Sequence, residues 1–139
     1  MKIVIDTSVW ISALITKKSQ ARGLLRLVLE AKVFPQMSEA LFCEMEAVMK
    51  RKKIQTLTPL SEVEQNTLFD AYLSHCRWNE IYYTWRPNLK DENDNFIVEL
   101  AVASGAEYVI TYNEKDFNAK ELSFAYTVVT PEAFLKEKI

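Results

Sequence analysis

The sequence is poor in the residues that build zinc and disulfide sites. Only two of its 139 residues are cysteine, Cys43 and Cys76, and only one is histidine, His75. The cysteines lie far apart and form no CxxC pair, which argues against a zinc site and against a redox pair. We expect both to be small, buried or half-buried apolar residues. His75 and Cys76 do not suit a nucleophile and its base, because neighbours on a helix face different directions.

The sequence also lacks a long apolar run and an excess of either charge. No stretch approaches the ~20 apolar residues that a membrane span needs, and Asp6 interrupts the first apolar run, so we expect no signal peptide and a cytoplasmic protein. With 17 basic and 19 acidic residues, the net charge of −2 gives no general basic field for nucleic acid. If the protein binds nucleic acid, metal ions and local basic patches would have to provide the attraction.

What remains is typical of one compact α/β domain. The chain is 49% hydrophobic and 26% charged, which suits a domain with its own core, and no repeat, low-complexity tract or linker divides it. Apolar runs alternate with longer amphipathic segments, the pattern of a mainly parallel sheet covered by helices. We therefore expect a single domain over residues 1–139.

Sequence patterns place the individual elements. Strands are expected at residues 2–5, 33–35, 81–83, 108–111 and 126–129. Helices are expected at residues 9–15, 20–31, 38–53, 61–75 and 91–103, and from 131 onward. Ser38 is a predicted N-cap, and Ser61 and Glu64 form a predicted capping box. Gly105 is a predicted C-cap, and Pro131 suits the first position of the last helix.

Asp6 stands at the end of the apolar run Ile3-Val4-Ile5. In open parallel sheets, ligands bind just beyond the carboxyl ends of such buried strands. An aspartate in this place is also a common helix N-cap, here for the segment that starts near Val9. The functional interpretation gains weight if other carboxylates return to the same edge of the sheet.

Glu44 is one such carboxylate. On a helical wheel it falls at the edge of the apolar arc formed by Leu41, Met45 and Val48, while Glu39 and Glu46 lie on the far side. It is either an inward-leaning acid or an edge residue that pairs with a lysine or arginine.

Asp94 falls between Ile97 and Val98 on the wheel of a mostly apolar helix, whose polar gap holds Glu92 and Glu99. Its place in the first turn is favoured by the helix dipole, which is the simpler explanation. A carboxylate directed into an apolar arc nevertheless needs a cation or hydrogen bonds.

Asn113 and Asp116 follow the predicted strand at 108–111, at the edge also predicted for Asp6. Turn chemistry alone would explain Asn113. Asp116 is therefore the preferred acid of the two.

Asp6, Glu44, Asp94 and Asp116 together form an oxygen-only set. Such sets select hard cations, Mg²⁺ or Mn²⁺, over zinc, and gathering these charges without a cation would be unfavourable. A metal held by carboxylates in turn indicates a phosphate substrate.

The chain resembles a PIN-domain ribonuclease of the VapC type, the toxin of a toxin–antitoxin pair. The resemblance spans nearly the whole chain and is carried by the following segments: Ile3-Val4-Ile5-Asp6-Thr7-Ser8, Ser38-Glu39-Ala40-Leu41 leading to Glu44, Asp94-Asn95-Phe96-Ile97-Val98-Glu99-Leu100-Ala101, Gly105 to Thr111, Lys115-Asp116-Phe117, and Val129 to Leu135. The chain departs from the family at Ser8, where Asn is usual, and at Asn113, where many members carry Asp.

The resemblance implies an α/β/α sandwich, a homodimer beside the acidic cleft and an antitoxin partner. It implies that Asp6, Glu44 and Asp94, with Asp116 or Asn113, hold one or two Mg²⁺ or Mn²⁺ ions that activate water for attack on RNA. The products would carry a 5′-phosphate and a 3′-hydroxyl, and the chemistry alone does not exclude DNA. Thr7, Ser8 and Thr111 would orient the carboxylates.

Basic and aromatic residues could hold the substrate. Candidates for phosphate contact are Lys50, Arg51, Lys52 and Lys53, together with Lys17, Lys18 and Arg22. The first four could equally complement a helix dipole. For Trp78, Tyr82, Tyr83 and Trp85 we favour core packing or contact with a dimer partner or antitoxin over base stacking.

Two other classes remain open. A phosphotransferase of the haloacid-dehalogenase type also begins with an aspartate after a buried strand, but it needs a second acid two residues later, where this chain has Ser8. A PIN-like fold kept as a non-catalytic binding module is the other alternative.

Overall fold

A five-stranded sheet forms the centre of the computed structural model, which describes residues 1–16, 19–81, 95–117 and 126–138. Its strands are β1 (Lys2–Ile5), β2 (Phe34–Met37), β3 (Arg77–Trp78), β4 (Tyr108–Ile110) and β5 (Thr127–Val129). They lie in the order β3-β2-β1-β4-β5, and every pairing is parallel. The predicted α/β class with a mainly parallel sheet is confirmed.

The central strands are apolar because both of their faces are covered. Ile3, Val4 and Ile5 of β1 are buried, as are Val109 and Ile110 of β4. β1 lies between β2 and β4, with Ile3 paired to Pro35 on one side and to Tyr108 on the other. Continuous Val/Ile runs are what a strand buried on both faces requires.

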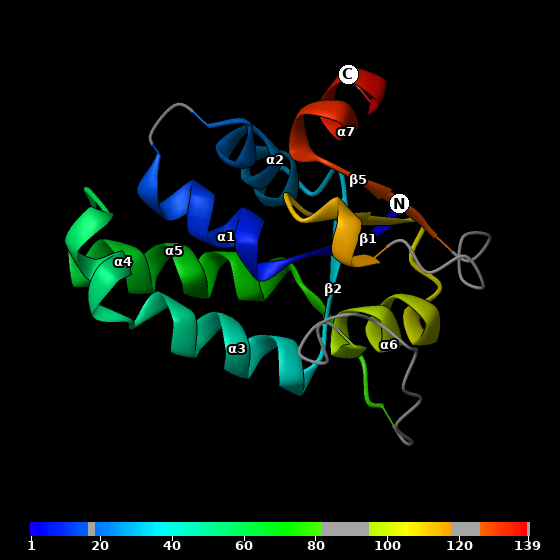
Figure 1. The fold of residues 1–139 in the computed structure, drawn as a ribbon, viewed down its shortest axis with the longest axis horizontal. Helices are drawn as coiled ribbons and strands as arrows, with labels where there is room; N and C mark the ends of the chain where they lie inside the picture. Colours follow the sequence, from blue (N-terminus) through cyan, green and yellow to red (C-terminus); the bar gives the residue numbers. More distant parts are fainter. Residues whose placement is uncertain (17–18, 82–94, 118–125, 139) are drawn as a thin grey trace.

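Helices cover the sheet on both sides. They are α1 (Thr7–Ile15), α2 (Gln20–Leu29), α3 (Glu39–Met49), α4 (Lys52–Leu57), α5 (Glu62–His75), α6 (Asn95–Ser104) and α7 (Pro131–Lys138), and a 3₁₀ turn, η2, spans Glu114–Phe117. Figure 1 shows α2 and α7 packed together on one side, and α6 on the other, against β1 and β2. These layers match the predicted α/β/α arrangement.

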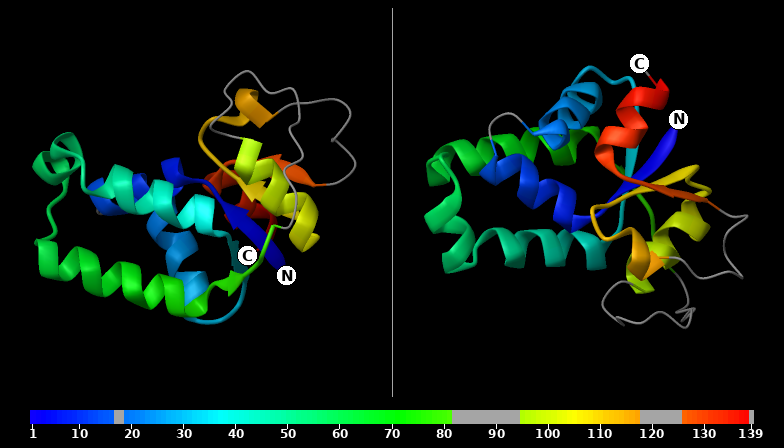
Figure 2. Two further views of the ribbon diagram at one scale, coloured as in Figure 1. Left: turned by 90° about the horizontal axis from the view of Figure 1, so that it is seen from below. Right: turned by 45° about the horizontal axis from the view of Figure 1, so that its top comes forward.

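Three helices between β2 and β3 extend away from the sheet. Both views in Figure 2 show α3 leading outward, α4 at the tip and α5 returning beside α3. α3 packs against α1, and α5 packs against α2. None of the described helices combines the length and the apolar character that crossing a membrane would demand.

Several predicted helix boundaries are confirmed. Ser61 and Glu64 form the capping box, with the Glu64 N–H donating to Ser61 Oγ at 3.1 Å and the Ser61 N–H donating to Glu64 Oε1 at 2.9 Å. Ser38 Oγ accepts from the Leu41 N–H at 3.3 Å. Gly105 has φ +70°, the left-handed conformation that suits a C-cap glycine, and α7 begins at Pro131.

Other boundaries differ from the prediction. The helix expected to run to residue 53 ends at Met49, and α4 starts at Lys52 with Arg51 in the extended conformation of an N-cap. The helix expected to reach Ala31 ends at Leu29, since Ala31 has φ +58°. β2 starts and ends later than expected. The sequence does not predict β3, because its two residues are exposed and show no apolar pattern.

The strand expected at 81–83 is not tested, since residues 82 and 83, like Trp85, lie outside the described residues. Ile81 belongs to no strand. The start of the helix expected from residue 91 also lies outside them.

Candidate active site

Asp6 lies at the point in the sheet where the order of the strands reverses. From β1 the chain adds β2 and β3 on one side, and β4 and β5 on the other. In open parallel sheets, the crevice at the carboxyl ends of the two strands at such a switch point is the usual ligand site. The Asp6 N–H donates to the carbonyl of Ile110 at 3.0 Å, which fixes Asp6 beside the end of β4.

The Asp6 carboxylate is buried and held by two hydroxyls. It is 4% exposed, and its Oδ2 accepts hydrogen bonds from Thr111 Oγ1 at 2.7 Å and from Ser8 Oγ at 2.9 Å. Asp6 occupies the N-cap position of α1, but its side chain makes no capping bond. The capping alternative therefore does not explain the aspartate. Its short hydrogen bond from Thr111, the residue after β4, indicates a carboxylate held in one position.

The two hydroxyls are themselves fixed by the loop that follows β4. Ser8 Oγ accepts from the Tyr112 N–H at 3.3 Å, and Thr111 Oγ1 accepts from the Asn113 N–H at 2.9 Å. The Tyr112 hydroxyl donates to Glu132 Oε1 at 3.3 Å. Partial burial raises the pKa of the Tyr112 phenol. Asn113 is exposed and contributes its backbone to this arrangement.

Glu44 reaches the same end of the sheet from α3. The hydroxyl of Thr7, the residue after Asp6, donates to Glu44 Oε2 at 3.1 Å. Thr7 is buried and Glu44 is half-buried, so the glutamate leans inward rather than into solvent. Two carboxylates distant in sequence are thus attached, through adjacent hydroxyl residues, to the first turn of α1.

The charge of Asp6 has no balancing lysine or arginine in the part of the chain that the structure describes. Within that part, Oδ1 of Asp6 accepts no hydrogen bond. An uncompensated buried charge is costly. A buried carboxylate that has one oxygen held by hydrogen bonds and the other available to coordinate a metal therefore suits a cation ligand. With Glu44 the donors are all oxygen, which suits Mg²⁺ or Mn²⁺.

The structure describes the side chains of only two of the four predicted acids, Asp6 and Glu44. Asp94 lies outside the described residues, and Asp116 lies in η2 with its side chain outside the description. No cluster of three or more metal-ligating side chains occurs among the residues that the structure does describe. Convergence of Asp94 and Asp116 on Asp6 and Glu44 therefore stays a prediction.

The proposed phosphate contacts divide into two groups. Lys50, Arg51, Lys52 and Lys53 are all exposed where α3 gives way to α4, rather than at the end of one helix. Arg22 instead donates from Nε to the carbonyl of Ala13 at 2.7 Å, tying α2 to α1. Lys17 and Lys18 lie outside the described residues.

Two residues are placed differently from the prediction. Cys43 is exposed, whereas Cys76 is half-buried as expected. Glu99, assigned to a polar gap, is only 7% exposed because α6 meets α3 as well as the sheet. Both border a hollow of about 980 Å³ beside Trp78, at the carboxyl ends of β2 and β3. A helical wheel drawn for α6 alone cannot predict that α3 also covers this helix.

The fold is shared with a solved structure. A chain in the crystal structure of VapBC2 from Rickettsia felis, bound to a DNA fragment from their promoter, is similar with a TM-score of 0.57 and 16% sequence identity. The match covers 92% of this chain and 97% of that chain. The comparison with curated proteins finds no match.

Sequence comparison gives the family directly. The family model of the PIN domain matches residues 2–115, which include both strands at the switch point, Asp6 and Glu44. The match extends over most of the chain and includes Thr7, Ser8 and Thr111, which hold the two carboxylates. The protein belongs to the PIN-domain family.

Proposed function

We propose that this protein is an endoribonuclease that depends on Mg²⁺ or Mn²⁺, cleaves single-stranded or structured RNA, and acts as the toxin of a toxin–antitoxin pair. The observation that carries the proposal is the Asp6 carboxylate, buried at the switch point of a PIN-family sheet, with one oxygen held by Ser8 and Thr111. Glu44, held by Thr7, supplies a second acid at the same place.

Asp6 and Glu44, with Asp94 and Asp116, would hold the metal. A divalent ion there would supply a Lewis acid that activates water and offsets the charge building on the scissile phosphate. The chain's own contribution is to position its donors. Thr111 and Ser8 fix the Asp6 carboxylate through hydrogen bonds to Oδ2 and leave Oδ1 to coordinate the metal. Thr7 orients Glu44 by a hydrogen bond to Oε2.

The exposed cations at the junction of α3 and α4 would hold the RNA. Lys50, Arg51, Lys52 and Lys53 are exposed, so their charges are accessible to the phosphates of a substrate. Lys17, Lys18 and, less directly, Arg22 would extend this contact. Because water rather than the 2′-hydroxyl is the nucleophile, cleavage would give a 5′-phosphate and a 3′-hydroxyl.

The toxin assignment rests on the family and on the fold shared with the VapBC2 chain. It entails a cognate antitoxin protein, a homodimer and action in the cytoplasm. Growth arrest on expression, relieved by the product of a small adjacent open reading frame, is the outcome that this assignment expects. An unaffected culture that accumulates folded, active nuclease would contradict the toxin role while leaving the enzyme.

Metal-dependent RNA cleavage is the first testable prediction. Purified protein should cut a labelled single-stranded RNA in the presence of Mg²⁺ or Mn²⁺ and stop on addition of EDTA. Asp6→Asn and Asp94→Asn should each lower the cleavage rate by roughly 10²-fold or more, since each removes a charged ligand. Product ends are read by gel mobility before and after phosphatase treatment.

The matched control is Asp70→Asn, an exposed aspartate of α5, which should cleave at the rate of the unmodified protein. Circular dichroism shows whether each variant is folded. Folded Asp6→Asn that cleaves as fast as the control would refute the proposed site. An acyl-phosphate trapped on Asp6 would instead indicate the phosphotransferase, and binding of RNA without cleavage would indicate a non-catalytic module.

A further inference from the structure

Tyr112 presents a partly exposed aromatic ring beside the candidate site. It follows Thr111 directly, and its backbone N–H donates to Ser8 Oγ at 3.3 Å, while Ser8 Oγ donates to Asp6 Oδ2 at 2.9 Å. Two hydrogen bonds therefore connect the backbone of Tyr112 to the buried carboxylate. Neither of them uses the ring, and the residue is 37% exposed.

Two other elements hold the far end of the ring. The Tyr112 hydroxyl donates to Glu132 Oε1 of α7 at 3.3 Å. Partial burial raises the pKa of the phenol, and a hydrogen bond with the side chain of Ser12 opposes this rise, which places Ser12 of α1 beside the hydroxyl. Ser8 and Ser12 are four residues apart and lie on one face of α1. The ring therefore extends along one turn of that helix, between fixed contacts at both ends.

The strand register brings this ring close to the candidate metal ligands. Ile5 and Ile110 are paired across β1 and β4, so Asp6 and Thr111 come next in register. Neighbouring strands lie about 4.8 Å apart, and consecutive Cα atoms are about 3.8 Å apart. The backbone of Tyr112 thus lies within about 10 Å of that of Asp6, a distance comparable with the size of a nucleotide.

A ring that is held at both ends suits a flat ligand. Fixing a mobile side chain against a ligand costs conformational entropy, and a side chain that is already fixed avoids most of this cost. The hydroxyl is engaged by Glu132, so the exposed part of Tyr112 offers mainly the ring. The bases of RNA are flat, and every base has a π-face that can stack on an aromatic side chain.

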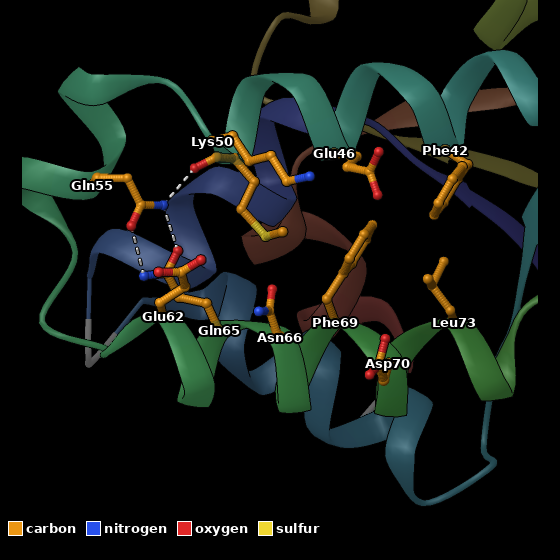
Figure 3. Close-up of a pocket in the computed structure, with 11 residues that line it drawn as sticks. Phe42, Glu46, Lys50, Gln55, Glu62, Gln65, Asn66, Phe69, Asp70 and Leu73 are labelled. Atoms are coloured by element: carbon orange, nitrogen blue, oxygen red, sulfur yellow. Dashed lines mark hydrogen bonds between the residues drawn. The ribbon is translucent and has the colours of Figure 1, made fainter.

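Other aromatic rings in the described part of the chain fit this role less well. Phe42 and Phe69 face each other between α3 and α5 with parallel rings and centroids 5.8 Å apart, so each covers a face of the other (Figure 3). Trp78 is 54% exposed, but β3 is two strands away from β1. The hollow beside Trp78 is lined by three carboxylates, those of Glu39, Glu80 and Glu99. Carboxylates repel the phosphates of RNA.

We propose that the ring of Tyr112 is the stacking platform for an unpaired base next to the scissile phosphate, and that it makes the site selective for unpaired RNA. The inference rests on the proposed function and deepens it by naming the substrate class. A base within a duplex is stacked between its neighbours, so its face is available only after costly unstacking and unpairing. Tyr112 is then a specificity-determining residue that touches the base rather than the metal.

The first experiment measures RNA binding to the full chain in EDTA. The probe is a short single-stranded RNA with one 2-aminopurine, whose position is moved along the strand in a series of oligonucleotides. Stacking on an aromatic ring quenches 2-aminopurine fluorescence, so the protein should quench one position more than the others. Tyr112→Leu should lose this quenching and weaken binding by roughly fivefold or more. Tyr112→Phe keeps the ring and should retain both.

Tyr108→Leu is the matched control. The Tyr108 hydroxyl also donates to a glutamate of α7, Glu137, at 3.4 Å, but Tyr108 lies at the opposite end of β4. This variant should bind and quench like the unmodified protein, and circular dichroism shows whether each variant is folded.

Several outcomes would overturn the proposal. These are equal losses in the Tyr108 and Tyr112 variants, unchanged quenching in Tyr112→Leu, and lost quenching in Tyr112→Phe. Lost quenching in Trp78→Leu alone would place the base in the hollow beside β3. A changed oligomeric state of Tyr112→Leu with unchanged RNA binding would assign the ring to a protein contact.

Kinetics separates this inference from the proposed nuclease. With Mg²⁺ or Mn²⁺, Tyr112→Leu should raise KM for single-stranded RNA by a similar factor and leave kcat near its original value, because the backbone bond to Ser8 remains. KM for a fully paired RNA of the same sequence should not change. Cleavage that persists with an unchanged KM would sink the stacking platform alone. If no form of the protein cuts RNA, the nuclease proposal fails, and the 2-aminopurine series in EDTA still decides whether a base stacks on Tyr112.

Discussion

Single hydroxyl groups hold the candidate site together, and Thr111 makes the shortest of these contacts with Asp6. Thr111→Val keeps the shape of the side chain but removes the donor to a buried carboxylate. We expect the free energy of unfolding to fall by ~1–3 kcal/mol, and the affinity for Mn²⁺ to fall by roughly 10–100-fold. Denaturant unfolding and calorimetric titration measure the two effects. Thr127→Val, at an exposed position of β5, is the matched control and should change neither.

The two thiols should differ sharply in reactivity. Burial raises the pKa of Cys76 to about 12, and its Sγ donates to the carbonyl of Tyr72 at 3.4 Å. Because the thiolate is the reactive form, Cys76 should stay unmodified near pH 8 while exposed Cys43 reacts. Iodoacetamide labelling followed by peptide mass analysis tests this. Equal labelling of both cysteines in the folded protein would be inconsistent with the buried thiol, and unfolding in guanidinium should expose it.

At the level of residues, the places of Asp6 and Thr111 in the fold could be predicted, and the limits on predicting the others are physical. Asp6 and Thr111 stand after apolar runs, so the topology of a parallel sheet brings them to one edge. Periodicity alone could not settle Glu44, because its inward lean depends on a hydroxyl from α1. The burial of Glu99 and the exposure of Cys43 depend on how three elements meet, and a wheel describes only one helix at a time.

Among the helices and strands, those with local chemical signals were predicted best. The capping box of α5, the N-cap of α3, Gly105 and Pro131 satisfy backbone groups within a few residues, so the sequence contains the whole interaction. The break between α3 and α4 has no glycine or proline to mark it, since Lys50 and Arg51 are compatible with a helix. β3 exists only because β2 lies beside it.

The capping box gives a prediction for α5. Ser61→Ala removes the acceptor for the Glu64 N–H and should lower the free energy of unfolding by ~1 kcal/mol. Chemical denaturation of the full chain, with an unchanged m-value, would report it. Ser74→Ala in the last turn of the same helix serves as the control. A loss as large for Ser74→Ala as for Ser61→Ala would show that the cap is not the source.

At the scale of the whole molecule, metal binding should couple to stability. A cation that binds the folded chain but not the unfolded one stabilises it by ~2.7 kcal/mol at a free concentration one hundred times its dissociation constant. The melting temperature should therefore rise with MnCl₂ in the unmodified protein and stay level in Asp6→Asn. Differential scanning fluorimetry measures both, with CaCl₂ and NaCl at matched ionic strength as references. An equal rise in Asp6→Asn would place the bound metal elsewhere.

The central position of the first strand governs when the site can form. β1 holds residues 2–5, yet one of its two neighbours, β4, spans residues 108–110, and Thr111 follows it. Closing so long a loop is slow and must wait for the distant segment to be synthesised. A nascent chain still short of Thr111 displays Asp6 without its strongest partner. The candidate site is thus incomplete until the chain has been synthesised past Thr111.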